Sequence, residues 1–411
     1  MSGKFQLPRG THDVLPSDAN WWHLVRVMEE VTALYGWGRI QTPGFEVTGL
    51  FVRTAGEASD VVHKEMYTFK DRSDRSLTLR PEGTAPIARA YLEHGMHRLP
   101  QPVKAYTIAP MYRYGAPGRG RHREHYQLSV EAIGSADPAI DAEIIQLYTE
   151  LLRRLGVTQW ELHLNSIGDE NCRPQYVEKL NEWLDAHADV LDDDARHKRG
   201  TSPLQVFDVK SPAVRAALED APKIGESLCD ACRQHFEQVQ RLLDAFGVPY
   251  VLDPTLVRGL DYYSRTTFEF IGPDENANST ICGGGRYYGL VEAIGGSPTP
   301  GIGFGAGLER LLLALENEGI VFELPQIEVF LVVEDASRRD AVLVALAALR
   351  RAGVSADTDY AGRSLKGQMT QAARSGATTI VIVRSDEVAI RREGRDEQLV
   401  ALDEVVATLT A

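Results

Sequence analysis

The sequence predicts an α+β fold in which a mostly antiparallel sheet with flanking helices precedes a smaller α/β domain. Between Val103 and Gly134, alternating residues surround a loop rich in glycine and arginine, a pattern typical of a long antiparallel hairpin. Near the C-terminus, apolar runs alternate with helical patterns, which predicts a small domain with a largely parallel sheet. The chain has 411 residues, more than one hydrophobic core usually holds, so we expect several domains.

Residues 1–167 and 229–323 are expected to form the larger, sheet-containing part. Apolar residues recur at helical spacing from Asn20 to Tyr35, and the pattern stops at Gly36. The segment Arg39–Pro43 predicts a short strand that ends at proline. Alternating patterns predict further strands at Trp160–Asn165, Tyr250–Leu252, Thr266–Ile271 and Ser279–Cys282.

Residues 168–228 interrupt this part with charged helical patterns at Arg173–Ala186 and Pro212–Asp220, which indicate a helical insertion. After a linker at Leu324–Gln326, residues 327–411 form the expected α/β domain. Its expected elements are strands at Ile327–Val333, near Ala356 and at Thr378–Val383, and helices at Ser337–Ala352 and Leu365–Ser375.

Composition places the chain among ordinary globular proteins, with 43% hydrophobic and 25% charged residues. The formal net charge of −14 excludes a protein that coats nucleic acid by bulk charge. Local basic sites remain open, because arginines and histidines cluster between Arg113 and His125. No apolar run approaches the roughly 20 residues needed to cross a membrane, and the first residues lack an apolar targeting core. We therefore expect a cytoplasmic protein.

The four cysteines do not form a disulfide framework in a chain of this length, which fits a reducing compartment. Cys229 and Cys232, with His235 one turn later, are spaced like half of a zinc site. The other half is missing, because Cys172 and Cys282 are isolated in the sequence. We therefore predict no metal site.

Three dense segments predict that an anion is held while a polar group is recognised: Thr78–Thr84, Met111–Glu131 and Arg258–Tyr263. The last reads Arg-Gly-Leu-Asp-Tyr-Tyr, a set that packing alone would rarely assemble. Arginines between Arg113 and Arg123 suit phosphate, because guanidinium groups bind phosphate oxygens bidentately; a solvated, flexible loop is the alternative. Three polar side chains among apolar neighbours need partners such as an ammonium or imidazole: Glu82, Gln127 and Glu131.

Gly301–Arg310 carries four alternating glycines, which let a strand pass close to a planar ligand. A dinucleotide fingerprint is rejected, because no βαβ unit with an acidic residue about 20 positions later follows. Arg310 begins the next helix, so its guanidinium and the helix N-terminus could hold the same anion. A surface salt bridge with Glu309 is the alternative.

Together these segments resemble the three motifs of class II aminoacyl-tRNA synthetases, and specifically the histidyl-tRNA synthetase family. The similarity runs from Arg9 to the C-terminus. The three motifs correspond to Pro43–Glu46, Met111–Glu131 and Gly303–Arg310, and two histidine-specific signatures correspond to Arg258–Tyr263 and Ile281–Tyr287. The resemblance implies a class II catalytic core with a helical insertion, a C-terminal anticodon-binding domain, and a homodimer formed through the first motif.

The resemblance also implies ATP-dependent activation of L-histidine to histidyl-adenylate and transfer to tRNA(His), with Mg2+ bridging the phosphates. Arg258 and Arg113 become the expected catalytic residues. The implied ATP-binding residues are Arg113, Arg121, Arg310 and Glu131. The implied histidine-binding residues are Glu82, Thr84, Gln127, Glu131, Arg258, Tyr262, Tyr263 and Tyr287. In the C-terminal domain the resemblance points to Lys366, Arg374 and Arg384 as contacts with tRNA.

Two departures from the family pattern concern ATP or tRNA contacts. Gly115 and Ala116 stand where the second motif usually has charged residues, and Tyr288 replaces an aspartate. Two other functions stay open: a histidine-binding regulatory subunit of ATP phosphoribosyltransferase, and a synthetase-like paralogue that makes the adenylate without charging tRNA. The arginines that are kept and the additional α/β domain favour the enzyme.

Overall fold

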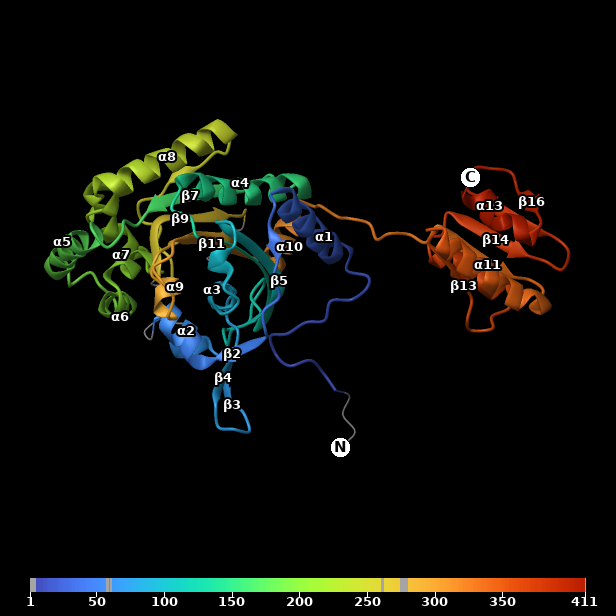
Figure 1. Cartoon of the computed structure of the whole chain (residues 1–411), viewed down its shortest axis with the longest axis horizontal. Helices are drawn as coiled ribbons and strands as arrows, with labels where there is room; N and C mark the ends of the chain where they lie inside the picture. The colour runs from blue at the N-terminus through green and yellow to red at the C-terminus, as the bar shows by residue number, and fades with distance from the viewer. Residues whose placement is uncertain (1–4, 57–58, 60, 260–261, 274–279, 411) are drawn as a thin grey trace. The chain divides into compact units, whose positions relative to one another are not determined.

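The computed structural model describes residues 5–410 except 57–58, 60, 260–261 and 274–279. Ser279, predicted to begin a strand, and Leu260 and Asp261 of the Arg258–Tyr263 segment lie outside the described residues. The chain divides into two compact units, Met1–Phe322 and Glu323–Ala411 (Figure 1).

An eight-stranded sheet forms the centre of the first unit (Figure 1). Neighbouring strands are antiparallel except for β1 with β5 and β7 with β8, which are parallel. The predicted hairpin is confirmed, because β5 pairs with β6 along ten residues of each. In sheet order the strands are β1 (Gly38–Arg39), β5 (Val103–Tyr112), β6 (Glu124–Ile133), β11 (Gly301–Gly307), β10 (Thr280–Tyr287), β9 (Tyr263–Ile271), β7 (Glu161–Ser166) and β8 (Val251–Leu252).

One face of this sheet packs on helices and forms the main hydrophobic core. The helices are α1 (Ala19–Leu34), α4 (Pro138–Leu155), α8 (Asp230–Phe246) and α10 (Leu308–Asn317). The sequence sets both ends of α4: the Asp137 side chain caps its first turn, Pro138 occupies the first position, and Gly156 ends it with a left-handed backbone. Along β6, Leu128, Val130 and Ala132 enter this core. Because strand side chains alternate, the residues between them face the other side of the sheet.

That other side is partly covered by α3 (Thr84–Glu93). Ile87 and Tyr91 of α3 form a second apolar cluster with Ile133 and Leu290. The remaining elements here are α2 (Thr48–Ala55), a π-helical turn (Val61–Glu65), a 3-10 turn (Met96–Arg98), α9 (Leu290–Ala293) and a small sheet in the order β2 (Phe45–Val47), β4 (Ser76–Leu79) and β3 (Thr68–Lys70). The glycines of β11 leave room between the two layers for polar side chains of β6.

Residues 168–228 are helical, and their buried side chains form a hydrophobic cluster of their own. Tyr176, Leu180 and Leu184 recur at helical spacing and supply its centre. The elements are α5 (Arg173–Ala186), α6 (Asp193–Thr201), α7 (Pro212–Ala217) and 3-10 segments at Pro203–Asp208, Leu218–Asp220 and Ile224–Ser227. The chain then returns to the main core through α8.

The second unit contains a five-stranded sheet in the order β13 (Ala356–Thr358), β12 (Val329–Val333), β14 (Thr379–Val383), β15 (Val388–Arg392) and β16 (Gln398–Val400). β12 is parallel to both of its neighbours, β13 and β14, whereas β15 is antiparallel to β14 and β16. The prediction of a largely parallel sheet is therefore wrong for half of it. The reason is a tight turn in which the Arg384 amide donates to the Glu387 carbonyl, because so short a connection permits only antiparallel pairing.

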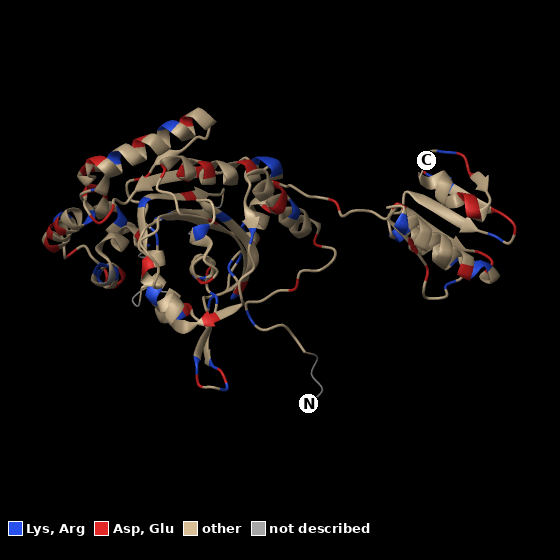
Figure 2. Cartoon of the chain, viewed as in Figure 1, with Lys and Arg blue, Asp and Glu red and all other residues tan. Residues whose placement is uncertain are grey.

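Helices of the second unit are α11 (Arg339–Arg351), α12 (Leu365–Arg374) and α13 (Val405–Thr410), with 3-10 turns at Ala336–Arg338 and Leu402–Glu404. Acidic and basic residues are interspersed over this unit (Figure 2). Across the described part of the chain, none of the helices has the length and apolar character required to span a membrane.

Candidate active site

Four arginines from separate parts of the sequence line one cavity of about 440 Å3. Arg113 follows β5, Arg121 lies in the β5–β6 connection, Arg258 precedes β9, and Arg310 lies in the first turn of α10. Arg121 also pairs with Glu65 at 3.1 Å. A second cavity of about 230 Å3 shares Arg113, Arg258 and Arg310 with the first, so the two spaces are contiguous. The structure thus gathers four guanidinium groups around one hollow.

Backbone carbonyls orient two of these arginines. Arg113 Nε donates to the Pro81 carbonyl at 2.8 Å, and Arg310 Nη1 donates to the Thr280 carbonyl at 2.7 Å. These backbone acceptors are neutral and orient the two guanidinium groups at the edge of the cavity.

Arg258 is held differently, because its Nη1 forms an ion pair with Glu269 of β9. Thr280 donates to the other Glu269 oxygen at 3.0 Å. The Arg258 Nε is buried and has no hydrogen-bond partner among the residues that the structure describes, an uncommon and costly state for a donor. Gly283 makes room for this side chain, since a Cβ at that position would lie 2.5 Å from Arg258 Nη2. The arginine is positioned with an unsatisfied donor beside both cavities.

The other residues that line the arginine cavity include three to which sequence reasoning gave no role of their own: His125, Glu269 and Thr280. His125 was counted in a basic cluster, but burial, with the nearby charges of Arg113 and Arg310, lowers its pKa to about 3. It is therefore a neutral imidazole. A signal for Glu269 was available in the sequence, where an acid interrupts the apolar end of a predicted strand.

The smaller cavity is lined by five of the predicted histidine-binding residues besides Arg258: Glu82, Thr84, Gln127, Tyr262 and Tyr263. Glu82 accepts hydrogen bonds from the Thr84 and Ala85 amides at 2.6 and 3.0 Å, at the N-terminus of α3. Gln127 lies opposite Gly307 in β11, and a Cβ on the neighbouring Gly305 would lie 2.6 Å from its Nε2. The alternating glycines thus make room for polar side chains of β6.

Glu131 lies deeper, with 1% of its surface exposed. Its two oxygens accept from Thr84 Oγ1 at 2.6 Å and from the Tyr287 hydroxyl at 2.8 Å. Gly303 is its register partner, and a Cβ there would lie 1.9 Å from Glu131 Oε2. Neither Glu131 nor Tyr287 is among the residues that line the two cavities. The predicted contact between Glu131 and ATP does not fit this position, because burial and two internal bonds turn its oxygens away from the arginine cavity.

The Gly115 departure lies in a segment with defined contacts. The Arg123 guanidinium lies 3.9 Å above the Tyr114 ring, and its Nε donates to the Gly115 carbonyl at 3.4 Å. Arg121 and Gly118 exchange backbone hydrogen bonds at 3.0 Å each. These contacts give this part of the loop a defined conformation in the structure. The alternative was a solvated, flexible loop.

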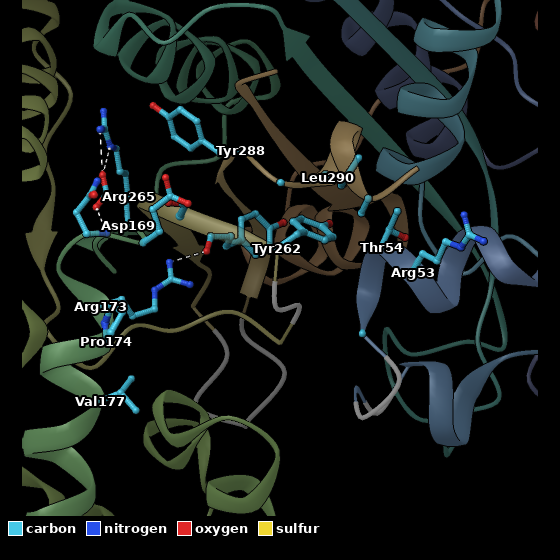
Figure 3. Close-up of a pocket in the computed structure, with 17 residues that line it drawn as sticks. Arg53, Thr54, Asp169, Arg173, Pro174, Val177, Tyr262, Arg265, Tyr288 and Leu290 are labelled. Atoms are coloured by element: carbon cyan, nitrogen blue, oxygen red, sulfur yellow. Dashed lines mark hydrogen bonds and ion pairs between the residues drawn. The ribbon is translucent and has the colours of Figure 1, made fainter. Parts of the chain in front are cut away.

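Tyr262 and Tyr263 separate the smaller cavity from a third one of about 660 Å3, which both also line (Figure 3). Tyr288 lies on this third cavity, and its buried hydroxyl has no hydrogen-bond partner within the described part of the chain. The Arg265 guanidinium lies 5.2 Å from the centre of its ring. The Tyr288 departure therefore faces the third cavity and not the arginine cavity.

A buried ion cluster lies under the site, on the helix side of the sheet. Arg286 of β10 bonds to Asp141 of α4, and Asp141 also accepts from His235 Nε2 at 2.8 Å and from Thr266 Oγ1 at 2.7 Å. In the sequence His235 follows Cys229 and Cys232 at the spacing of half a zinc site. In the structure it bonds to Asp141 of α4 instead.

Comparison with known proteins was decisive for the family. A sequence profile described as Histidyl-tRNA synthetase matches residues 10–311. The chain belongs to the histidyl-tRNA synthetase family. It is 47% identical to the histidine–tRNA ligase of Desulforudis audaxviator, over 98% of this chain and 97% of that protein. It is 49% identical to the histidine–tRNA ligase of Moorella thermoacetica, over 93% and 91%. The crystal structure of apo histidyl-tRNA synthetase from S. aureus superimposes with a TM-score of 0.84, at 36% identity, covering 99% of this chain and all of that one.

The position of Glu131 predicts a pH-dependent stability of the ligand-free protein. Burial raises the Glu131 pKa to about 8, whereas a glutamate in an unfolded chain titrates near about 4.3. Between these values the folded state holds a proton that the unfolded state has released, so rising pH favours unfolding. We expect the urea midpoint to fall between about pH 5 and about pH 8. Glu131→Gln should flatten that slope, and an unchanged slope in this variant would assign it to other groups.

Proposed function

We propose that this chain activates L-histidine with ATP to histidyl-adenylate and transfers the histidyl group to tRNA(His). The observation that carries the proposal is the convergence of Arg113, Arg121, Arg258 and Arg310 on one cavity. Four cations at one hollow suit a triphosphate, and the contiguous smaller cavity is lined by acids, amides and phenols that suit an amino acid. The names of the most similar relatives agree with this activity.

In the first step a histidine carboxylate oxygen attacks the α-phosphorus of ATP, and the bond from that phosphorus to the pyrophosphate oxygen breaks. Arg113 and Arg258 lie at the junction of the two cavities, where they would stabilise charge on the α-phosphate. Arg121 and Arg310 would bind the outer phosphates. No side chain has to act as a nucleophile, since the carboxylate of the substrate does so.

Mg2+ fits the donors that are present. It prefers oxygen ligands and commonly binds through one or two carboxylates together with substrate phosphates. Glu65 and Glu269 both line the arginine cavity and would contribute these carboxylates. When bound, the ion would neutralise charge on the phosphates.

Histidine recognition would use the smaller cavity. Glu82, Thr84 and Gln127 would bind the amino group, and Tyr263 would bond one imidazole nitrogen. Glu131 lies beneath the lining of this cavity, so it would bond the other nitrogen by exchanging its Thr84 contact for the ligand, while Tyr287 continues to hold it. An amino acid without these nitrogens would not replace the contact that Glu131 gives up, which gives discrimination without an editing site.

We assign residues 1–167 and 229–323 to the catalytic core, 168–228 to an insertion and 327–411 to an anticodon-binding domain. Lys366 and Arg374 are exposed on α12 and are suited to phosphate contacts. Arg384 is not, because it pairs with three acids, Glu334, Glu387 and Glu397.

A homodimer is supported by exposed apolar side chains on the small sheet that contains the segment resembling the first motif. Phe45 and Val47 of β2 and Phe69 of β3 are all exposed there. Aromatic and aliphatic groups left in water favour an interface. A cytoplasmic location would match the activity, because protein synthesis there uses the charged tRNA.

Two assays on the full chain test the proposed function. We expect histidine-dependent exchange of pyrophosphate into ATP, and charging of tRNA(His). Exchange without charging would favour a paralogue that makes the adenylate for another acceptor. Absence of both activities would favour a histidine-binding regulatory protein.

A further inference from the structure

Four potential metal ligands meet where the insertion begins and ends. Asp169 and Cys172 precede α5, and Cys229 and Cys232 lie at the start of α8. One ligand atom from each lies within 4.8 Å of all the others. Cys172 is isolated in the sequence, but the fold brings it against the Cys229–Cys232 pair, so the basis for predicting no metal site does not hold.

The spacing of these atoms fits a tetrahedral ion. Cys172 Sγ lies 3.8 Å from Cys232 Sγ, and Asp169 Oδ1 lies 3.8 Å from Cys172 Sγ and 4.0 Å from Cys229 Sγ. A tetrahedral zinc ion with Zn–S bonds of about 2.3 Å separates its sulfur ligands by about 3.8 Å. All four cysteines of the chain are free thiols in this structure.

The surrounding structure orients the ligands before any ion binds. Cys172 and Cys229 are the N-cap residues of α5 and α8, so two of the four ligands are fixed at the ends of helices. Asp169 Oδ2 accepts from Arg265 Nη2 at 3.1 Å (Figure 3), and its Oδ1 lies on the side of the sulfurs. Gly168 has a left-handed backbone, and a Cβ there would lie 2.7 Å from Cys172 Sγ. Hydrogen bonds that orient a ligating carboxylate, as Arg265 does here, are typical of metal sites. The glycine leaves space for the thiol.

We propose that Asp169, Cys172, Cys229 and Cys232 bind one zinc ion that closes the two ends of the insertion. Four protein ligands complete the tetrahedron, so the site is structural and no position remains for a substrate. Binding releases the thiol protons, since zinc is held by thiolates. Three of the four residues are buried and Cys229 is partly exposed, which leaves an entry path for the ion.

The site is placed to stiffen the wall of the histidine cavity. Arg173, next to Cys172, donates to the Tyr263 carbonyl at 2.8 Å, and Arg265 donates its amide to the Gly168 carbonyl at 2.7 Å. An ion that fixes Asp169 and Cys172 would therefore hold the strand that presents Tyr263. Loss of zinc is expected to lower the stability of the insertion more than that of the rest of the unit.

Metal content of the full chain, purified without chelators from zinc-supplied cells, tests the proposal. We expect about one zinc per chain by elemental mass spectrometry. After chelator treatment, Co2+ should produce thiolate-to-cobalt charge-transfer bands and intense ligand-field bands of a tetrahedral site, both abolished by added Zn2+.

Variants identify the ligands. Cys172→Ser and Cys232→Ser should lose most of the zinc, whereas Cys282→Ser, which removes a buried cysteine of β10 outside the cluster, should keep it. If a ligand variant fails to fold, the cobalt titration of the unmodified chain still decides. Zinc well below stoichiometry together with no cobalt bands would overturn the proposal, as would a disulfide between Cys172 and Cys232 in non-reducing peptide maps.

Discussion

Arg258→Ala is expected to lower histidine-dependent exchange of pyrophosphate into ATP by about 10²–10³-fold, the usual cost of removing one preorganised donor to a developing charge. Arg258 lines both cavities, and its buried Nε has no partner within the described residues. A ligand oxygen would satisfy that donor. The effect should fall mainly on the rate at saturating substrate, because the charge that the arginine meets develops in the transition state.

Arg258→Ala also leaves the half-buried Glu269 carboxylate without its ion pair, so a loss of stability has to be separated from a loss of exchange. The double variant Arg258→Met with Glu269→Gln removes both charges together and should restore stability without restoring exchange. Arg153→Ala, on the exposed face of α4 and paired only locally with Glu150, is the matched arginine control and should exchange normally. Near-normal exchange by a folded Arg258→Ala protein would refute the assigned role.

Arg286→Met is expected to destabilise the fold by about 3–5 kcal/mol, the usual cost of leaving one partner of a buried ion pair behind. Both Arg286 and Asp141 have 0% of their surface exposed. Burial alone would raise the Asp141 pKa, but the Arg286 and His235 contacts outweigh it and lower this pKa, so the carboxylate stays charged. The variant therefore leaves the buried Asp141 charge with only its His235 and Thr266 contacts.

Urea unfolding at neutral pH measures this loss. Adding Asp141→Asn to Arg286→Met should recover much of it, because the double variant buries no unpaired charge. Arg153→Met, at an exposed position, should change stability by less than about 0.5 kcal/mol. A loss below about 1 kcal/mol for Arg286→Met alone would mean that water reaches Asp141 and solvates it.

Local patterns predicted most of the fold. The β5–β6 hairpin, the insertion helix α5 and the strand β11 followed by α10 appear close to where periodicity and glycine spacing put them. Strand ends were less well predicted, since β1 is only Gly38–Arg39 and β10 continues to Tyr287. Pairing depends on partners outside the strand, which a window of local sequence does not contain.

The sequence by itself determined that this chain has an antiparallel core with a helical insertion and an α/β domain, and which side chains were available to hold an anion beside a polar group. Those signals are local, because side-chain periodicity and glycine spacing act within one element. Tertiary structure alone decided that Glu269 pairs with Arg258, that His235 bonds Asp141, and that Cys172 meets Cys232. Such contacts join residues on different elements, and only packing of the apolar faces sets where those elements meet.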